Sequence, residues 1–126
     1  MTELESEKLK AGILLFQEGN YFDAHDMWEE VWQDLSGHKR IFWQSLIQIS
    51  VACYHIENGN RKGAEGMLEK ASHKISSLQL QMSHQCLTQI SQLIQVLKAE
   101  IAVSVFSTET VQFMNEIITD DLLSFA

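Results

Sequence analysis

The absence of proline is the feature that most restricts the fold of this chain. None of the 126 residues is proline, and only six are glycine. Because proline interrupts helix interiors and is common in turns, a chain without it favours long helices joined by short connections. The length suits one domain that buries a real core. We therefore expect a single helical domain over residues 1–126.

Hydrophobic periodicity divides this domain into helices. Apolar residues recur three and four positions apart, which is the spacing of a helix with one buried face. Gly19 and Gly59 can each end a helix, and Asn20 and Asn60 can each cap the next one. Residues 36–38 read as a turn. The pattern predicts helices at about 3–18, from Asn20 to about 35, at about 40–57, from Asn60 through 78, after Ser83 through 101, and a short sixth helix from about 108.

An internal repeat indicates how these helices are arranged. Residues 19–29 and 59–69 share five identities at an offset of forty, including the Gly-Asn pair and a following alanine. Self-similarity at such a period is typical of stacked helical hairpins. The turn beginning at Gly19 is similar to the turn between the helices of tetratricopeptide repeats. We expect an all-α bundle of two stacked helix-turn-helix hairpins of tetratricopeptide-like geometry, plus one or two C-terminal helices.

Charge and cysteine usage restrict the partners and the compartment. The formal net charge is −8, and the nine Lys and Arg residues are scattered, so we expect neither nucleic acid nor a membrane surface as partner. The most apolar window, 41–54, is too short and too often polar to cross a bilayer. Cys53 and Cys86 form no Cys-x-x-Cys pair, and the acidic N-terminus is unlike a signal peptide. These features predict a cytoplasmic protein.

One constellation of residues could carry chemistry. At 100° per residue, His25, Glu29 and Trp32 fall within about 60° on the second helix, and Tyr21 joins the same face one turn earlier. On the third helix, Gln48 and His55 share a narrow polar line with Gln44. Polar residues on an apolar helix need partners. We therefore expect the two faces to meet and to form a cleft.

Three interpretations of this cleft remain open. His25 and Glu29 could bind a divalent metal ion, with His55 or Asp26 as a third ligand, or could work without metal as an acid–base pair. A His–Glu pair at this spacing also occurs as an ordinary boundary ion pair. In that case, Gln48 would be a satisfied core polar group, and Trp28 and Trp32 would be core residues.

The sequence also resembles a known family. Two blocks carry the resemblance: FQEGNYFDAHDMWEEVW over residues 16–32, and LIQISVACYHIENGNRKGA over residues 46–64. They look like the signature of the domain of unknown function 309 family of small helical proteins. That family carries a His-x-x-x-Glu-x-x-Trp/Tyr motif suspected of binding metal, which falls on His25, Glu29 and Trp32. Departures include Asp23 and Asp26, where the family commonly has glutamate.

The leading hypothesis is a small protein that binds a divalent metal or a small ligand between its second and third helices. His25, Glu29 and His55 are the predicted metal ligands, and the supporting residues are Tyr21, Asp26, Trp28, Trp32 and Gln48. The first alternative is a non-catalytic module that binds a protein partner in a groove between stacked hairpins. The second is a structural motif that ties the two helices together by hydrogen bonds. The resemblance supplies no reaction.

Overall fold

The computed structural model describes residues 1–125, and Ala126, the last residue of the predicted domain, lies outside them. These residues form helices and connecting turns, with no strand in the described part of the chain. The prediction of an all-α fold is confirmed. The elements are α1 (Glu3–Gln17), α2 (Tyr21–Trp32), α3 (Gly37–Glu57), α4 (Arg61–Gln81), α5 (Gln85–Ala99), α6 (Thr108–Ile117) and the 3-10 helix η1 (Asp120–Ser124).

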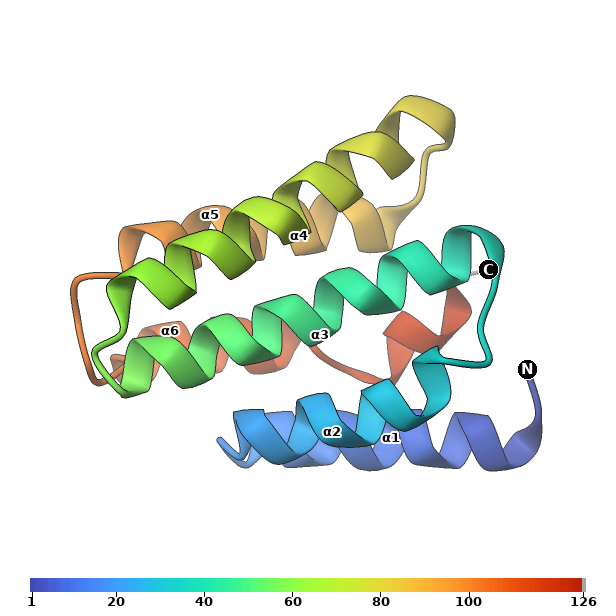
Figure 1. The fold of residues 1–126 in the computed structure, drawn as a ribbon, viewed down its shortest axis with the longest axis horizontal. Coiled ribbons are helices and arrows are strands. Elements are labelled where there is room, and N and C mark those ends of the chain that lie inside the picture. The colour runs from blue at the N-terminus through green and yellow to red at the C-terminus, as the bar shows by residue number, and fades with distance from the viewer. Residues whose placement is uncertain (126) are drawn as a thin grey trace.

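The long helix α3 lies at the centre of the bundle (Figure 1). It packs against α4 on one side and against α2 on the other, while α1 pairs with α2 and α5 with α4. The C-terminal elements α6 and η1 return to α1. Their connection to it includes a hydrogen bond of 2.9 Å from Gln17 Nε2 to the carbonyl of Ile118. The polar positions of α2 and α3 are therefore held on two neighbouring helices within one packed body.

The two Gly-Asn turns share one backbone geometry. Gly19 and Gly59 have φ of 85° and 71°, a region that favours glycine. The amides of Asn20 and Asn60 each bond at 2.8 Å to a carbonyl five residues earlier, Leu15 and His55 respectively. This bond and the glycine conformation are those of a Schellman helix end. The sequence identity at offset forty thus corresponds to two identical helix terminations.

The caps that follow these turns differ. The Asn60 side chain accepts a hydrogen bond from the amide of Gly63, as predicted, but Asn20 makes no side-chain cap, so that part of the prediction was wrong. A Cβ atom at Gly63 would lie 2.6 Å from Asn60 Nδ2. The corresponding residue in the first turn is Asp23, which has a Cβ. An Asn cap of this conformation is therefore sterically excluded at the start of α2.

The connection between α2 and α3 lies about three residues earlier than predicted. Helix α2 ends at Trp32 rather than near residue 35, and α3 begins at Gly37 rather than near residue 40. The cause is Arg40, whose guanidinium donates to the carbonyls of Trp32, Gln33 and Leu35 at 3.0 to 3.2 Å. This single side chain bonds the carbonyl of the last residue of α2 and two carbonyls of the connection that follows it.

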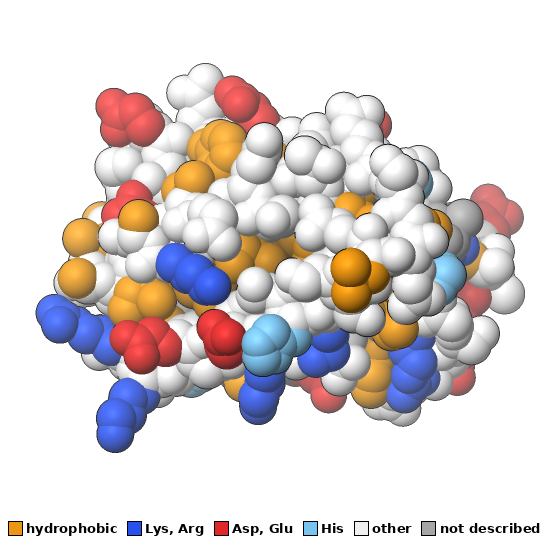
Figure 2. Space-filling model, turned by 90° about the horizontal axis from the view of Figure 1, so that it is seen from above, with side chains coloured by type: hydrophobic (Ala, Val, Ile, Leu, Met, Phe, Trp, Pro, Cys, Tyr) orange, Lys and Arg blue, Asp and Glu red, His pale blue; other side chains and the backbone are white. Residues whose placement is uncertain are grey.

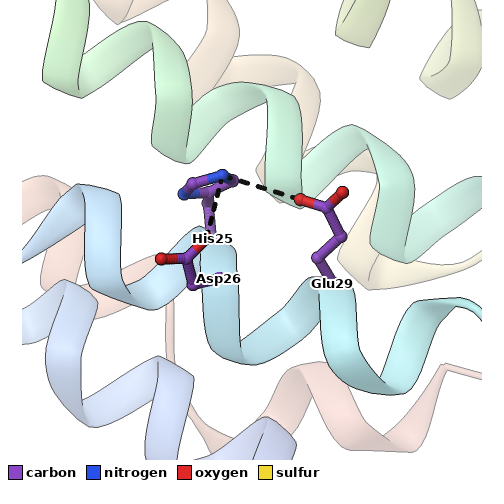
Figure 3. A group of neighbouring side chains, drawn as sticks. All are labelled: His25, Asp26 and Glu29. Carbon is purple, nitrogen blue, oxygen red and sulfur yellow. Dashed lines mark ion pairs between the residues drawn. The ribbon is translucent and has the colours of Figure 1, made fainter.

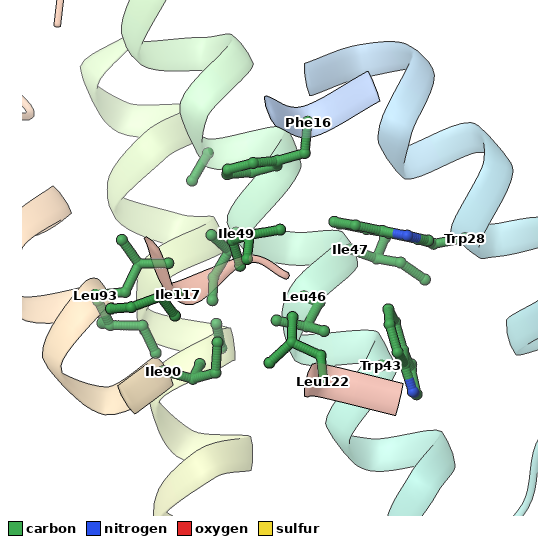
Figure 4. Close-up of a cluster of buried hydrophobic side chains, with 14 of the residues drawn as sticks. Phe16, Trp28, Trp43, Leu46, Ile47, Ile49, Ile90, Leu93, Ile117 and Leu122 are labelled. Atoms are coloured by element: carbon green, nitrogen blue, oxygen red, sulfur yellow. The ribbon is translucent and has the colours of Figure 1, made fainter. Parts of the chain in front are cut away.

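The core is built around two fully buried tryptophans, Trp28 of α2 and Trp43 of α3 (Figure 4). Their ring centroids lie 5.7 Å apart with an edge-to-face inclination of 63°. The indole N–H of Trp28 donates to the carbonyl of Leu9 at 3.0 Å, which ties α2 to α1. Phe16 stacks on the same indole at 6.1 Å. Trp28 therefore fixes the rotation of α2 about its own axis.

Gly12 should be essential for this packing. A Cβ atom there would lie 2.3 Å from Trp28 Nε1, so Gly12→Ala forces Trp28 or α1 to move. We expect Gly12→Ala to lower the free energy of unfolding by about 1–3 kcal/mol, as overpacking does. The matched control is Gly66→Ala in α4, where a Cβ meets nothing within 4 Å.

The control should stabilise the protein by about 0.5–1 kcal/mol, because alanine is the better helix former. Urea denaturation of both variants measures the difference. A stabilising effect of Gly12→Ala would contradict the close approach of α1 to Trp28.

Candidate functional site

His25, Asp26 and Glu29 form a cluster on the outer half of α2. One donor atom from each side chain lies within 4.8 Å of the others. His25 Nε2 is 3.4 Å from Asp26 Oδ1 and 3.6 Å from Glu29 Oε2. Figure 3 shows the imidazole between the two carboxylates, with a contact to each. The His25 side chain is 13% exposed, whereas both acids are at least half exposed. The imidazole is therefore packed against the protein, and the two carboxylates lie on its solvent side.

The protonation of the neutral His25 ring is fixed by its own helix. The ring Nδ1 is hydrogen-bonded to the carbonyl of Phe22. Because a carbonyl only accepts, Nδ1 carries the proton, and Nε2 of the neutral ring presents a lone pair. That lone pair faces two carboxylates. A backbone carbonyl on the far nitrogen is the usual support of a metal-binding histidine.

A cleft of about 220 Å³ adjoins this cluster between α2 and α3. Glu29 and Trp32 of α2 line one wall, and Gln44, Ile47 and Gln48 of α3 line the other. Glu29 belongs to both the cluster and the cleft. Gln48 Oε1 is buried without a hydrogen-bond partner in the described residues. An unpartnered buried oxygen is costly, so it favours a donor arriving from outside the chain.

The other predicted site residues take different positions. His55 is not part of the cluster, and the expectation of a His25–Glu29–His55 set is not met: its Nδ1 lies 3.3 Å from Asn60 Nδ2 at the turn before α4. Tyr21 is a core residue, with its ring 4.8 Å from that of Phe16 and its carbonyl bonded by Ser50. Burial raises its pKa above the ordinary tyrosine value. Tyr21 therefore supports the helix contact and does not reach His25 Nε2.

The two tryptophans of the motif have separate roles. Trp28 is completely buried. Trp32 is half-buried, donates its indole N–H to the carbonyl of Arg40 at 3.0 Å, and carries the Arg40 guanidinium 4.0 Å above its ring. This cation–π contact restrains the indole ring at the edge of the cleft. Trp32 is the cleft wall that the sequence predicted.

The hydrogen bonds between α2 and α3 show which motif residues tie the two helices together. In residues 1–125 they come from Ser50 to the carbonyl of Tyr21 and from the reciprocal pair of Trp32 and Arg40. Of the motif residues, Trp32 takes part in these bonds, whereas His25 and Glu29 do not. The cluster is therefore not a hydrogen-bonded tie between these helices.

The part of the chain that contains the cluster also matches a known protein family. Residues 9–67 match the family model described as Domain of unknown function (DUF309). The match runs from α1 into α4 and includes the cluster and both Gly-Asn turns, and it confirms the resemblance seen in the two sequence blocks.

One curated relative is the "Uncharacterized protein YpuF" of Bacillus subtilis (strain 168), which is 36% identical over 50 residues. Those residues are 39% of this chain and 29% of that protein, so the chain matches less than a third of the relative's length. No solved structure matches the chain.

Two further observations concern the helices as possible membrane spans and the charges on one face of the molecule. No helix in residues 1–125 combines the length and apolar character that crossing a membrane requires. On the face seen from above α4 and α5, side chains of both charges are interspersed (Figure 2).

The ring assignment of His25 can be tested directly. At alkaline pH, where imidazole is neutral, we expect long-range proton–nitrogen spectra to show Nδ1 protonated and Nε2 bare. The exposed His73, which has no backbone carbonyl partner and lies 3.1 Å from Glu69, is the internal comparison. A His25 ring protonated at Nε2 would contradict the hydrogen bond to Phe22.

Proposed function

We propose that this protein binds a divalent metal ion through His25, Asp26 and Glu29. The observation that carries the proposal is the convergence of one oriented imidazole nitrogen and two carboxylate oxygens within 4.8 Å. First-row metal–ligand bonds are about 2 Å, so donors that lie within 4–5 Å of each other can share one ion after small side-chain rotations. The three side chains need no backbone movement, because they lie on one helix within two turns.

The donor set indicates the class of metal. One imidazole nitrogen with two carboxylates suits zinc, iron, manganese or nickel, and is a poor set for soft metals that prefer thiolates. Three protein ligands leave coordination positions open for water or for a ligand. A metal held there supplies Lewis-acid polarisation of a bound oxygen. Without metal, the same three groups would form an acid–base site, in which the carboxylates would accept a hydrogen bond from Nε2 when the ring is protonated there.

The adjoining cleft supports a small ligand beside the ion. Glu29 forms its rim, Trp32 gives it a flat wall, and the amides of Gln44 and Gln48 supply hydrogen-bonding groups. Its volume of about 220 Å³ is below the 300–1,000 Å³ usual for drug-sized ligands. The unpartnered Gln48 oxygen favours a ligand with an N–H or O–H group.

Metal titration of the purified, chelator-treated protein tests the proposal. We expect one zinc or manganese ion per chain by calorimetry, and at least a tenfold loss of affinity in His25→Ala and in Glu29→Gln, because each removes a ligand. The matched control is His73→Ala. His73 and Glu69 also stand four residues apart with their side chains in contact at 3.1 Å, but no second carboxylate joins them.

The control should bind as the unmodified protein does. Equal losses in His25→Ala and His73→Ala, or no loss in either, would contradict a site at the cluster. Thermal unfolding with saturating metal is an independent readout, because an ion at about 100 times its Kd stabilises the folded state by about 2.7 kcal/mol.

The alternative function is a module that binds a protein partner without metal. The observation that favours it is the shared geometry of the two Gly-Asn turns, since stacked hairpins of this kind form grooves. It predicts partner capture that His25→Ala and chelation leave unchanged. Capture that depends on both would favour the metal site instead.

A further inference from the structure

A second hollow lies on the other side of Phe22 from the cluster. It has a volume of about 220 Å³ and is lined by residues 19–23, at the turn into α2, and by Tyr54 and Glu57 near the end of α3. It shares no residue with the His25, Asp26 and Glu29 set or with the cleft beside Trp32. The hollow is therefore a separate site from the proposed metal site, although Phe22 lies between the two and contacts His25.

Two exposed aromatic rings form one side of this hollow. Phe22 is 47% exposed and Tyr54 is 38% exposed, although α2 and α3, the helices that carry them, bury other residues in the core. Their ring centroids lie 5.0 Å apart with an inclination of 52°, so the rings form an open angle and are not stacked face to face. Phe22 also packs edge-on against His25 at 4.6 Å, which restrains its ring. The pair presents aromatic surface to solvent in a fixed arrangement.

Two unpaired carboxylates form the other side. Asp23 and Glu57 line the hollow, and neither makes an ion pair with a Lys, Arg or His of residues 1–125. Desolvation raises the pKa of the Glu57 carboxyl above its ordinary value. Glu57 also acts electrostatically on the buried Tyr21 hydroxyl, whose pKa is raised first by burial, then by Cys53 and then by Glu57.

Aromatic faces beside uncompensated carboxylates recognise organic cations. A cation within about 6 Å of a ring centroid is attracted by the negative face of the ring, and a carboxylate adds charge neutralisation. An apolar ligand would gain from the rings but would desolvate the acids, and an anion would be repelled by them. The net charge of −8 raises the local concentration of cations further.

We propose that the hollow between Phe22, Tyr54, Asp23 and Glu57 binds an ammonium or guanidinium group carried on an alkyl chain. The rings of Phe22 and Tyr54 contact the cation and its first methylene groups, and Glu57 and Asp23 neutralise it. The volume admits such a head group rather than a drug-sized molecule. The same chemistry occurs in a small alkylamine and in a lysine or arginine side chain.

Titration followed by proton–nitrogen NMR tests the proposal, on chelator-treated protein so that the metal site takes no part. The probes are n-butylammonium, n-butylguanidinium and the neutral analogue pentan-1-ol. We expect saturable shifts confined to amides of residues 19–23 and 54–57 for the two cations and none for the alcohol. Tyr54→Leu and Glu57→Gln should each weaken cation binding at least about threefold, and Tyr54→Phe, which keeps the ring, should not.

The matched control for charge is Glu109→Gln, which removes one exposed carboxylate from the first turn of α6, outside the hollow. It should leave the affinity unchanged. Equal weakening by Glu57→Gln and Glu109→Gln would reduce the effect to net charge and overturn the proposal, as would equal binding of pentan-1-ol or shifts spread over the whole surface.

A further arm identifies the source of the cation. An acetylated, amidated tripeptide with a central lysine that binds tighter than n-butylammonium supports a peptide ligand. Weaker binding of the tripeptide supports a free alkylamine. Failure of both cationic probes to bind overturns the site, whatever the metal titration shows.

Discussion

The packing of Trp28 against Gly12 is the interaction on which the rest of the structure depends. The indole occupies the space that a side chain at position 12 would fill, and its N–H is satisfied by the carbonyl of Leu9. With Trp43 on its other side, it fixes how far α1, α2 and α3 approach and how α2 is rotated. His25 lies three residues before Trp28 and Glu29 one residue after it. Burial of Trp28 therefore places both at the boundary between core and solvent, where a ligand can be reached.

The fold was largely predictable because helical periodicity and glycine chemistry are local properties. The stripe of α4 predicted from Ala64 to Leu78 is buried apart from the partly exposed Met67, and α6 begins at the residue expected. The errors arose where the side chain of another residue decides the outcome. Arg40 ends α2 from the following helix, and Asp23 excludes the Asn20 cap that the equivalent Gly63 permits for Asn60. Hydrophobic periodicity and cap preferences include neither effect, because both depend on three-dimensional contacts of one particular side chain.

The candidate site was also predictable only in part. The spacing on one helix correctly placed His25 and Glu29 together. Asp26 joins them although its Cα lies about 100° from that of His25 around the helix axis, because its carboxylate turns toward His25 Nε2. Which residue of α3 lies beside the cluster depends on the register between α2 and α3, which run antiparallel. Hydrophobic periodicity within one helix carries no information on that register. Ser50 lies against Tyr21, and Tyr54 packs on Phe22. His55 is therefore level with the start of α2, away from His25 Nε2. Gln48, from the same predicted line, does reach the cleft.

The proposed site depends on His25 Nε2 being the single imidazole donor of a mixed nitrogen–oxygen set. X-ray absorption at the metal edge of the zinc-loaded protein measures this directly. We expect one imidazole nitrogen with carboxylate oxygens at about 2.0–2.2 Å, and loss of the imidazole scattering in His25→Ala. Two imidazoles in the shell, or imidazole scattering that persists without His25, would show that the metal binds elsewhere and would contradict the role assigned to this cluster.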